Sequence, residues 1–185
     1  MKTVKVDSII GIDPGASGGI AMWHDGRAEA FKMPSDGQSL ARIIDQYSGG
    51  RTLVFLEKLC LFRSDIAVID GRAHMGKLYR VQKLLANYEG IKATLDVLGI
   101  PFVLVPPRTW QARLLLTSSR CRDKAARKHI YKERAKKLYP NMPVTLWNAD
   151  ALLLMHFGRY VLKSQPFWLF QNMDEKQRRI LFKFL

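Results

Sequence analysis

The chain has 185 residues, of which 48% are hydrophobic and 25% are charged. This composition is typical of one globular domain and excludes a disordered or fibrous protein. Thirty Lys and Arg residues against sixteen Asp and Glu residues give a formal net charge of +14. Such an excess favours a polyanionic partner, although a basic protein without a nucleic acid partner is the alternative.

The chain also lacks the marks of a secreted or membrane protein. Cys60 and Cys121 are too few for a disulfide framework or a zinc cluster, which indicates a reducing compartment. No apolar run approaches the roughly 20 residues that cross a bilayer, and the N-terminus does not resemble a signal peptide. We expect a cytoplasmic or nucleoid-associated protein, or an organellar one whose import signal was removed.

The first part of the chain predicts three short β-strands. Residues 6 to 13 and 18 to 24 are apolar runs separated by a Gly/Pro turn, and residues 27 to 34 alternate well enough to form a third strand. Their short connections predict an antiparallel meander. The first run ends in Asp13, and an isolated buried carboxylate is costly. Asp13 therefore needs a cation of the protein, a metal ion or water opposite it.

Helical and strand patterns alternate along the rest of the chain. The predicted segments are a helix over residues 40 to 47, a buried strand over 52 to 59, a long helix over 76 to 98, a short strand over 101 to 107, a basic helix over 121 to 140 and an apolar helix over 145 to 163. This order predicts an α/β domain over residues 1 to 163, with a mixed sheet and helices on both faces. Residues 164 to 185 are expected to form a C-terminal appendage and not a separate domain.

Three acidic residues stand in apolar surroundings: Asp13 at the end of the first strand, Glu57 inside the fourth, and Asp150 near the start of the last helix. If the first and fourth strands are neighbours, Asp13 and Glu57 lie side by side, and the last helix could bring Asp150 to them. Three converging carboxylates repel one another unless a divalent cation neutralises them, and their oxygens favour magnesium or manganese. Two alternatives stay open, since Asp13 could be a turn residue and Asp150 a first-turn acid favoured by the helix dipole.

The segments IIGIDPGASGGIA, LVFLEKL and NADALLLMHFG resemble the acidic motifs of the RuvC-type Holliday junction resolvases, including phage and organellar relatives. VPPRTWQ followed by TSSRCRDKAARKHI is similar to the segment that opens a basic helix in this family. The likeness covers roughly residues 6 to 162. It implies a ribonuclease H-like fold with a mixed five-stranded sheet. It also implies a metal-dependent endonuclease that nicks four-way DNA junctions symmetrically in recombination and repair.

The resemblance implies that Asp13, Glu57 and Asp150 are catalytic residues and the ligands of two Mg²⁺ ions, for which Mn²⁺ is expected to substitute. Family members usually place a fourth ligand, an acid or histidine, about one helical turn before the acid equivalent to Asp150. Here that position is Trp147. Asn148 and Thr145 are weaker oxygen ligands nearby, and the departure leaves reduced or lost activity open.

Basic residues predict where DNA would lie. Eight Lys and Arg residues fall between positions 121 and 138, either as a phosphate-contacting surface or as an ordinary solvated face. Lys124 matches a DNA-contacting lysine of the family, and Phe62 would either wedge against a base pair or pack in the core. The predicted DNA-binding residues are Lys124, Arg127, Lys128, Arg122, Arg108, Lys77, Arg80 and Phe62.

The long helix over residues 76 to 98 resembles the element that pairs two subunits in the family, although its apolar stripe would look the same if it packed on the sheet. A junction with two symmetric nicking sites calls for a two-fold dimer. We therefore expect a homodimer acting on branched DNA, with no membrane and no small-molecule cofactor. The alternatives are a catalytically silent or weak junction-binding protein and a ribonuclease H-like nuclease with another branched substrate.

Overall fold

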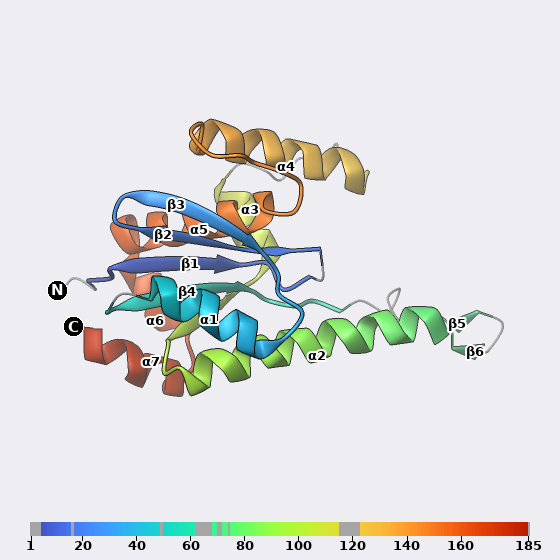
Figure 1. Cartoon of the computed structure of the whole chain (residues 1–185), viewed down its shortest axis with the longest axis horizontal. Coiled ribbons are helices and arrows are strands. Elements are labelled where there is room, and N and C mark those ends of the chain that lie inside the picture. The colour runs from blue at the N-terminus through green and yellow to red at the C-terminus, as the bar shows by residue number, and fades with distance from the viewer. Residues whose placement is uncertain are drawn as a thin grey trace.

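The computed structural model describes residues 5–15, 17–48, 50–61, 68–69, 72–73, 75–114 and 123–184. Its centre is a five-stranded sheet in the order β3-β2-β1-β4-β7 (Figure 1). The strands are β1 (Ser8–Ile12), β2 (Gly19–His24), β3 (Arg27–Lys32), β4 (Thr52–Glu57) and β7 (Phe102–Val105). The first three form the predicted antiparallel meander, and β1, β4 and β7 run parallel. The predicted α/β class and mixed sheet are confirmed.

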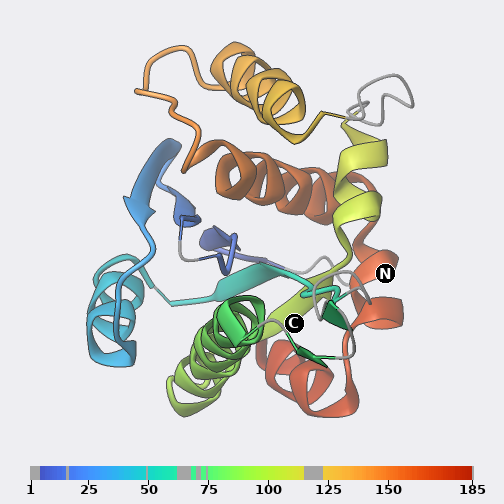
Figure 2. The same cartoon turned by 90° about the vertical axis from the view of Figure 1, so that its right-hand side faces the viewer.

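Helices cover both faces of this sheet. On one face lies α5 (Ala149–Ser164), with α3 (Pro107–Arg113) and α4 (Lys124–Leu138) beside and above it. On the other face lie α1 (Gly37–Tyr47) and α2 (Met75–Val97). Figure 2 shows α4, α5, the sheet and the α1/α2 pair as successive layers. No helix in the described part of the chain combines the length and apolarity that crossing a membrane requires.

The alternation of side chains along the strands divides the apolar core in two. Ile10, Ile12 and Leu56 pack toward α1 and α2, whereas Ile9 and Phe55 pack toward α5. Successive strand residues point to opposite faces, so Asp13 and Glu57 continue the set that faces α5. In the parallel pair, Ile12 lies opposite Leu56, so both acids emerge at the same edge of the sheet.

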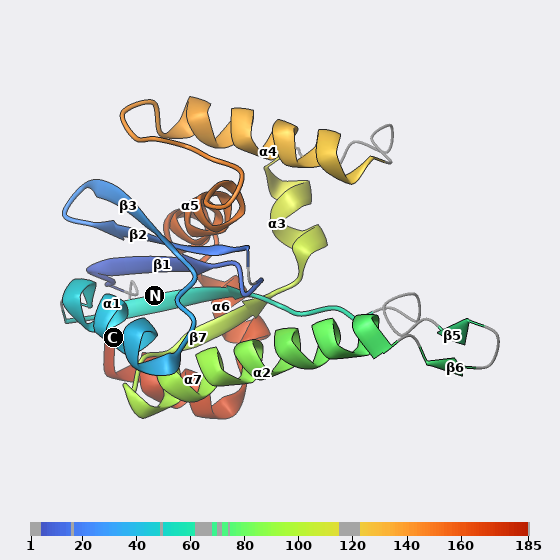
Figure 3. The same ribbon diagram turned by 45° about the vertical axis from the view of Figure 1, so that its right-hand side comes forward.

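The two halves of α2 have different surroundings. Tyr88, Ile91 and Leu95 in its second half are buried in the core. In its first half, Met75 is 71% exposed and Tyr79 57% exposed. Figure 3 shows this first half extending beyond the sheet, with the small hairpin of β5 (Val68–Ile69) and β6 (Arg72–Ala73) at its end. Packing on the sheet therefore explains only part of the apolar stripe predicted for this helix.

The residues after 164 contribute to the core. They form α6 (Pro166–Asn172), α7 (Glu175–Leu181) and a short 3₁₀ turn, Phe182–Phe184. Leu169 and Leu181 are fully buried in the core on the α5 side. Gln177 of α7 accepts a hydrogen bond from Phe102 N (2.9 Å) and donates one to Asp96 Oδ1 (3.0 Å). The α7 helix thus covers the edge strand β7, while the predicted domain boundary near residue 163 stays a prediction.

Some element bounds differ from the sequence prediction for identifiable reasons. Pro107, expected only to end a strand, also starts α3, because its fixed φ suits the first helical turn. The last helix begins at Ala149 and not near residue 145, since Asn148 holds the preceding turn through Thr145 N (2.8 Å) and Pro143 O (3.0 Å). The basic helix begins at Lys124, where the Asp123 side chain accepts from Ala125 N and Ala126 N.

Candidate functional site

Asp13 leaves the end of β1 in a tight turn. Its backbone N–H donates to Gly19 O (3.0 Å), and its Oδ1 accepts from Gly15 N (3.2 Å). A side chain at Gly18 would place its Cβ 2.3 Å from the Asp13 carbonyl oxygen, so only glycine fits there. Asp13 therefore makes the turn bond that the alternative reading anticipated, and it also faces α5.

Glu57 is the last residue of β4, not an interior one as predicted. Trp110 of α3 donates from its indole Nε1 to Glu57 Oε2 at 2.8 Å. Trp110 is 1% exposed and packs edge-on against Tyr131 of α4, with ring centroids 5.5 Å apart. Because the indole is locked by packing, the bond fixes the Glu57 side chain. Sequence reasoning missed this residue, although a Trp N–H in a buried segment needs an acceptor.

Asp150 reaches this edge because α5 lies directly on β1. A Cβ at Gly11 would lie 2.4 Å from both Ala151 O and Met155 N, so the absent side chain lets the helix backbone touch the strand. Gly158 of α5 likewise allows a close approach, because a Cβ at that position would clash with the ring of Phe55 in β4. Asp150 directly precedes Ala151, and this seating carries its side chain toward Asp13.

The three carboxylates act on one another electrostatically. Burial, and then the charge of Asp13, raise the pKa of Glu57 to about 8 and that of Asp150 to about 6. Burial likewise raises the pKa of Asp13. Asp150 also acts to raise the pKa of Glu57, whereas the Trp110 bond lowers it. The structure therefore brings the three predicted acids to one place, where their negative charges are incompletely compensated.

The donor set fits a hard divalent cation. All three side chains offer carboxylate oxygens, and Asp150 Oδ1 is buried with no hydrogen-bond partner among the described residues. Within the described ranges, however, no three His, Cys, Asp or Glu side chains are grouped closely enough to hold one ion. Asp150 Oδ2 instead lies 3.4 Å from Lys128 Nζ. Taking up an ion would thus require these side chains to draw closer together.

An apolar ring occupies the position at which the family resemblance implies a fourth ligand. Trp147 lies against the start of β2, since a Cβ at Gly19 would meet its Cε3 at 3.0 Å. Of the two weaker ligands expected nearby, Asn148 already uses its amide in the turn before α5. In the described part of the chain, Thr145 Oγ1 is buried without a hydrogen-bond partner. His156, six residues after Asp150 on α5, contacts the Tyr139 hydroxyl through Nδ1 (3.2 Å).

The predicted DNA-binding residues fall into three groups. Arg127 and Lys128 of α4 lie near the carboxylates, and their charges act on Asp150. Arg108 is exposed on the first turn of α3, while Lys77 and Arg80 lie on the first half of α2. Arg122, Phe62 and the side chain of Lys124 lie outside the described residues, so their predicted roles stay predictions.

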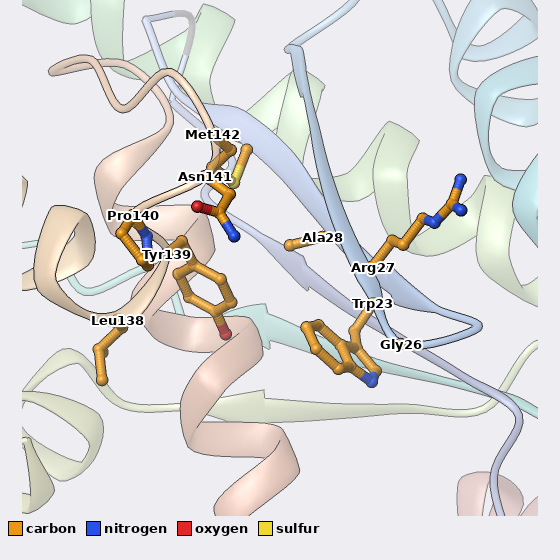
Figure 4. Close-up of a pocket in the computed structure, with 9 residues that line it drawn as sticks. All are labelled: Trp23, Gly26, Arg27, Ala28, Leu138, Tyr139, Pro140, Asn141 and Met142. Atoms are coloured by element: carbon orange, nitrogen blue, oxygen red, sulfur yellow. The ribbon is translucent and has the colours of Figure 1, made fainter.

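A pocket of about 400 Å³ lies elsewhere on this face of the molecule, between the β2–β3 turn and the end of α4 (Figure 4). Trp23 and Tyr139 line it, with ring centroids 6.4 Å apart. Trp23 is paired with Ile9 of β1, away from the end that carries Asp13. The described residues that line it include no acidic one, and the pocket is separate from the carboxylates.

The fold is similar to that of RuvC from T. thermophilus in complex with a Holliday junction substrate. The alignment has a TM-score of 0.52 and 16% sequence identity, and it covers 85% of this chain and 96% of that chain. A second structure of Thermus thermophilus RuvC aligns with a TM-score of 0.49 and 15% identity, over 83% and 95% of the two chains. No protein-family model matches the sequence, and no curated protein does. The first of these alignments shows that the chain has the ribonuclease H-like α/β fold of RuvC.

Proposed function

We propose that this protein is a magnesium-dependent, structure-selective endonuclease that nicks four-way DNA junctions symmetrically. The observation that carries the proposal is the convergence of Asp13, Glu57 and Asp150, from β1, β4 and α5, at one edge of a RuvC-like sheet. Their raised pKa values, due to burial and mutual repulsion, are typical of functional carboxylates. The net charge of +14 suits a DNA substrate.

In this proposal, the three carboxylates hold Mg²⁺, for which Mn²⁺ would substitute, and the family resemblance implies two ions. Bound divalent ions lower the pKa of an attacking water and stabilise the leaving oxygen of a phosphodiester. The protein's own contribution is to fix the ligands. Trp110 orients Glu57, and the contact of α5 with Gly11 positions Asp150.

The DNA is proposed to lie across the edge where α3 and α4 meet the carboxylates. Arg108 and Arg127 are exposed there, and the predicted contact of Lys124 would extend the same surface. Phosphate contacts of this kind position the substrate without reading its sequence. Lys77 and Arg80 of α2 would contact DNA arms farther from the cut.

A homodimer is proposed because two symmetric nicks need two active sites. The first half of α2 supports it, since Tyr79 and Met75 are exposed and continue the apolar pattern beyond the sheet. Contact between the α2 helices of two copies would bury these side chains.

The direct test incubates the protein with a synthetic four-way junction, or a linear duplex of the same sequence, in Mg²⁺ and in Mn²⁺. We expect paired nicks in opposite strands of the junction only. Asp13→Asn should reduce cutting by about 10³-fold or more while junction binding persists, because it removes a metal ligand and no basic residue. Asp7→Asn is the matched control, since Asp7 is paired with Arg51 away from the site, and it should cut normally. Normal cutting by Asp13→Asn would disprove the assignment.

A junction-binding protein without activity is the second candidate. It is favoured by Trp147 at the position where the resemblance implies a fourth ligand, and by the finding that no three acidic, His or Cys side chains among the described residues are grouped closely enough to hold one ion. Tight junction binding without nicks in either metal would establish it.

A further inference from the structure

Lys128 lies against the carboxylates, not on the outer surface of α4. Its Nζ is 3.4 Å from Asp150 Oδ2, and the side chain is 32% exposed. Burial raises the pKa of Asp13, Glu57 and Asp150, and the charge of Lys128 acts against that rise at all three. The sequence predicted Lys128 as a DNA contact, whereas the structure directs it to the acids.

The packing of α4 holds Lys128 in this place. Tyr131 and Ala135, three and seven residues after Lys128, are buried against the rest of the fold, so the three residues share one helix face. Tyr131 packs on Trp110, and Trp110 in turn donates to Glu57. Lys128 and the Glu57 carboxylate are therefore positioned by the same pair of buried aromatic rings, Tyr131 and Trp110.

The charges in this cluster favour fewer metal ions than the resemblance implies. Three ionised carboxylates and one ammonium leave a net charge of −2, which one divalent ion neutralises. A second ion would have to bind beside the Lys128 ammonium, and like charges in a partly buried site repel strongly. At the position where the resemblance implies a fourth ligand, this chain has Trp147, whose ring is apolar.

We propose that Lys128 permanently supplies the positive charge that a second metal ion would otherwise supply, so that the carboxylates take up one divalent ion. This inference rests on the proposed function, because it concerns the same carboxylates. It changes the expected chemistry from two ions to one ion and a fixed ammonium. It also removes Lys128 from the set of phosphate contacts that serve only to hold DNA.

The experiment counts Mn²⁺ ions bound to the intact chain at pH 8, with free Mn²⁺ measured by electron paramagnetic resonance. Sites are counted only if Asp13→Asn abolishes them, which excludes surface carboxylates. The wild type should bind one such ion. Lys128→Met should bind a second ion, or bind the first about tenfold more tightly, because a nearby positive charge is lost. Lys128→Gln provides a second neutral variant, and circular dichroism checks that both are folded.

Two controls separate the local charge of Lys128 from the overall charge of the protein. Lys137→Met removes the same charge from the same helix about 13 Å farther along its axis, and it should leave ion number and affinity unchanged. Lys128→Arg keeps the charge and should bind one ion.

Two Asp13-dependent ions in the wild type, no such ion, or unchanged binding in both neutral variants would overturn the inference. A wild type that binds its ion but never cuts a junction would instead contradict the proposed function, while the ion count would still stand.

Discussion

The two ends of β1 hold acidic residues in opposite electrostatic conditions. Near its start, Asp7 accepts bonds from Arg51 Nε (3.2 Å), its guanidinium NH2 group (3.0 Å) and its backbone N (3.0 Å). The Arg51 side chain holds the pKa of Asp7 below its usual value. Beyond its end, burial raises the pKa of Asp13, and Asp150 Oδ1 has no hydrogen-bond partner within the described ranges. An acidic residue beside a strand is thus no sign of function by itself. An acidic residue whose negative charge is left uncompensated is a sign of function.

Beside the start of β1, a serine of β1, a histidine at the end of β2 and an aspartate in the turn after β2 only superficially resemble a catalytic triad. Ser8 Oγ lies 2.6 Å from His24 Nδ1, and His24 Nε2 lies 3.1 Å from Asp25 Oδ2. Ser8 is 1% exposed, however, and its hydroxyl donates to Tyr47 O (3.0 Å). Because the hydroxyl is buried and already engaged, this group stabilises the sheet and offers no nucleophile.

The largest expected effect comes from separating α5 from β1. Gly11→Ala would place a methyl group 2.4 Å from two backbone atoms of α5, so we expect a loss of roughly 3 kcal/mol or more in the free energy of unfolding. Gly90→Ala is the matched control, because no atom of the described residues outside the neighbouring helix backbone lies within 4 Å of a Cβ there, and it should stabilise α2 by roughly 0.5 to 1 kcal/mol. Urea unfolding measures both. Equal, small effects would show that α5 is not seated on Gly11.

A smaller effect on the free energy of unfolding, of opposite sign, is expected when the Glu57 carboxylate is replaced. Between its ordinary pKa of 4.5 and the folded-state pKa of about 8, Glu57 binds a proton only in the folded state. Stability without metal should therefore fall as pH rises through this range. Glu57→Gln removes the free-energy cost of ionising this buried carboxyl group. We therefore expect stabilisation by roughly 2 kcal/mol at pH 8.5 in EDTA and almost none at pH 4. Unfolding at the two pH values checks this, and destabilisation at pH 8.5 would contradict it.

The bond from Trp110 should adjust the pH dependence of metal binding. Since ions compete with protons for Glu57 and Asp150, Mn²⁺ affinity should rise between about pH 6 and 8. Trp110→Phe removes a donor that lowers the pKa of Glu57, so the midpoint of this rise should move upward by roughly 0.5 to 1 pH unit. Titrations of Mn²⁺ at several pH values measure the midpoint. A midpoint that stays in place would show that the indole does not act on Glu57.

The smallest effect on stability is expected near the start of β1, where Asp7 is paired with Arg51. Asp7→Asn loses an exposed ion pair with Arg51, and such pairs contribute little to stability. We expect slight destabilisation above pH 5 that disappears at lower pH, where Asp7 would be protonated in both states. Thermal unfolding checks the direction, which should be opposite to that of Glu57→Gln at high pH.

The burial and the shared face of Asp13 and Glu57 could be predicted from the sequence because both follow from short-range rules, whereas the place of Asp150 depended on the family resemblance. The run ending at Asp13 and the run containing Glu57 are apolar enough to be buried parallel strands, and strand alternation then places both acids on one face. The glycine that admits α5 was visible in the same motif, although its contact with Ala151 was not.

Lys128 was predicted only as a DNA contact and not as a neighbour of the acids, and Trp110 was not predicted as part of the site; the reason in both cases is geometric. A helix with basic residues on several sides does not indicate which side packs, and α4 is oriented by Tyr131 and Ala135 against distant elements. Trp110 lies on a helix of only seven residues, α3, whose first proline reads equally well as the end of a strand. Both roles depend on how separate helices dock, and local patterns do not encode that.

Anomalous diffraction of Mn²⁺ in crystals of the wild-type protein tests the carboxylate site most directly. We expect a peak within coordination distance of Asp13 and of at least one other carboxylate, Glu57 or Asp150, with no such peak in crystals of Asp13→Asn. Crystals saturated with Mn²⁺ in which these three side chains contact no ion would contradict it.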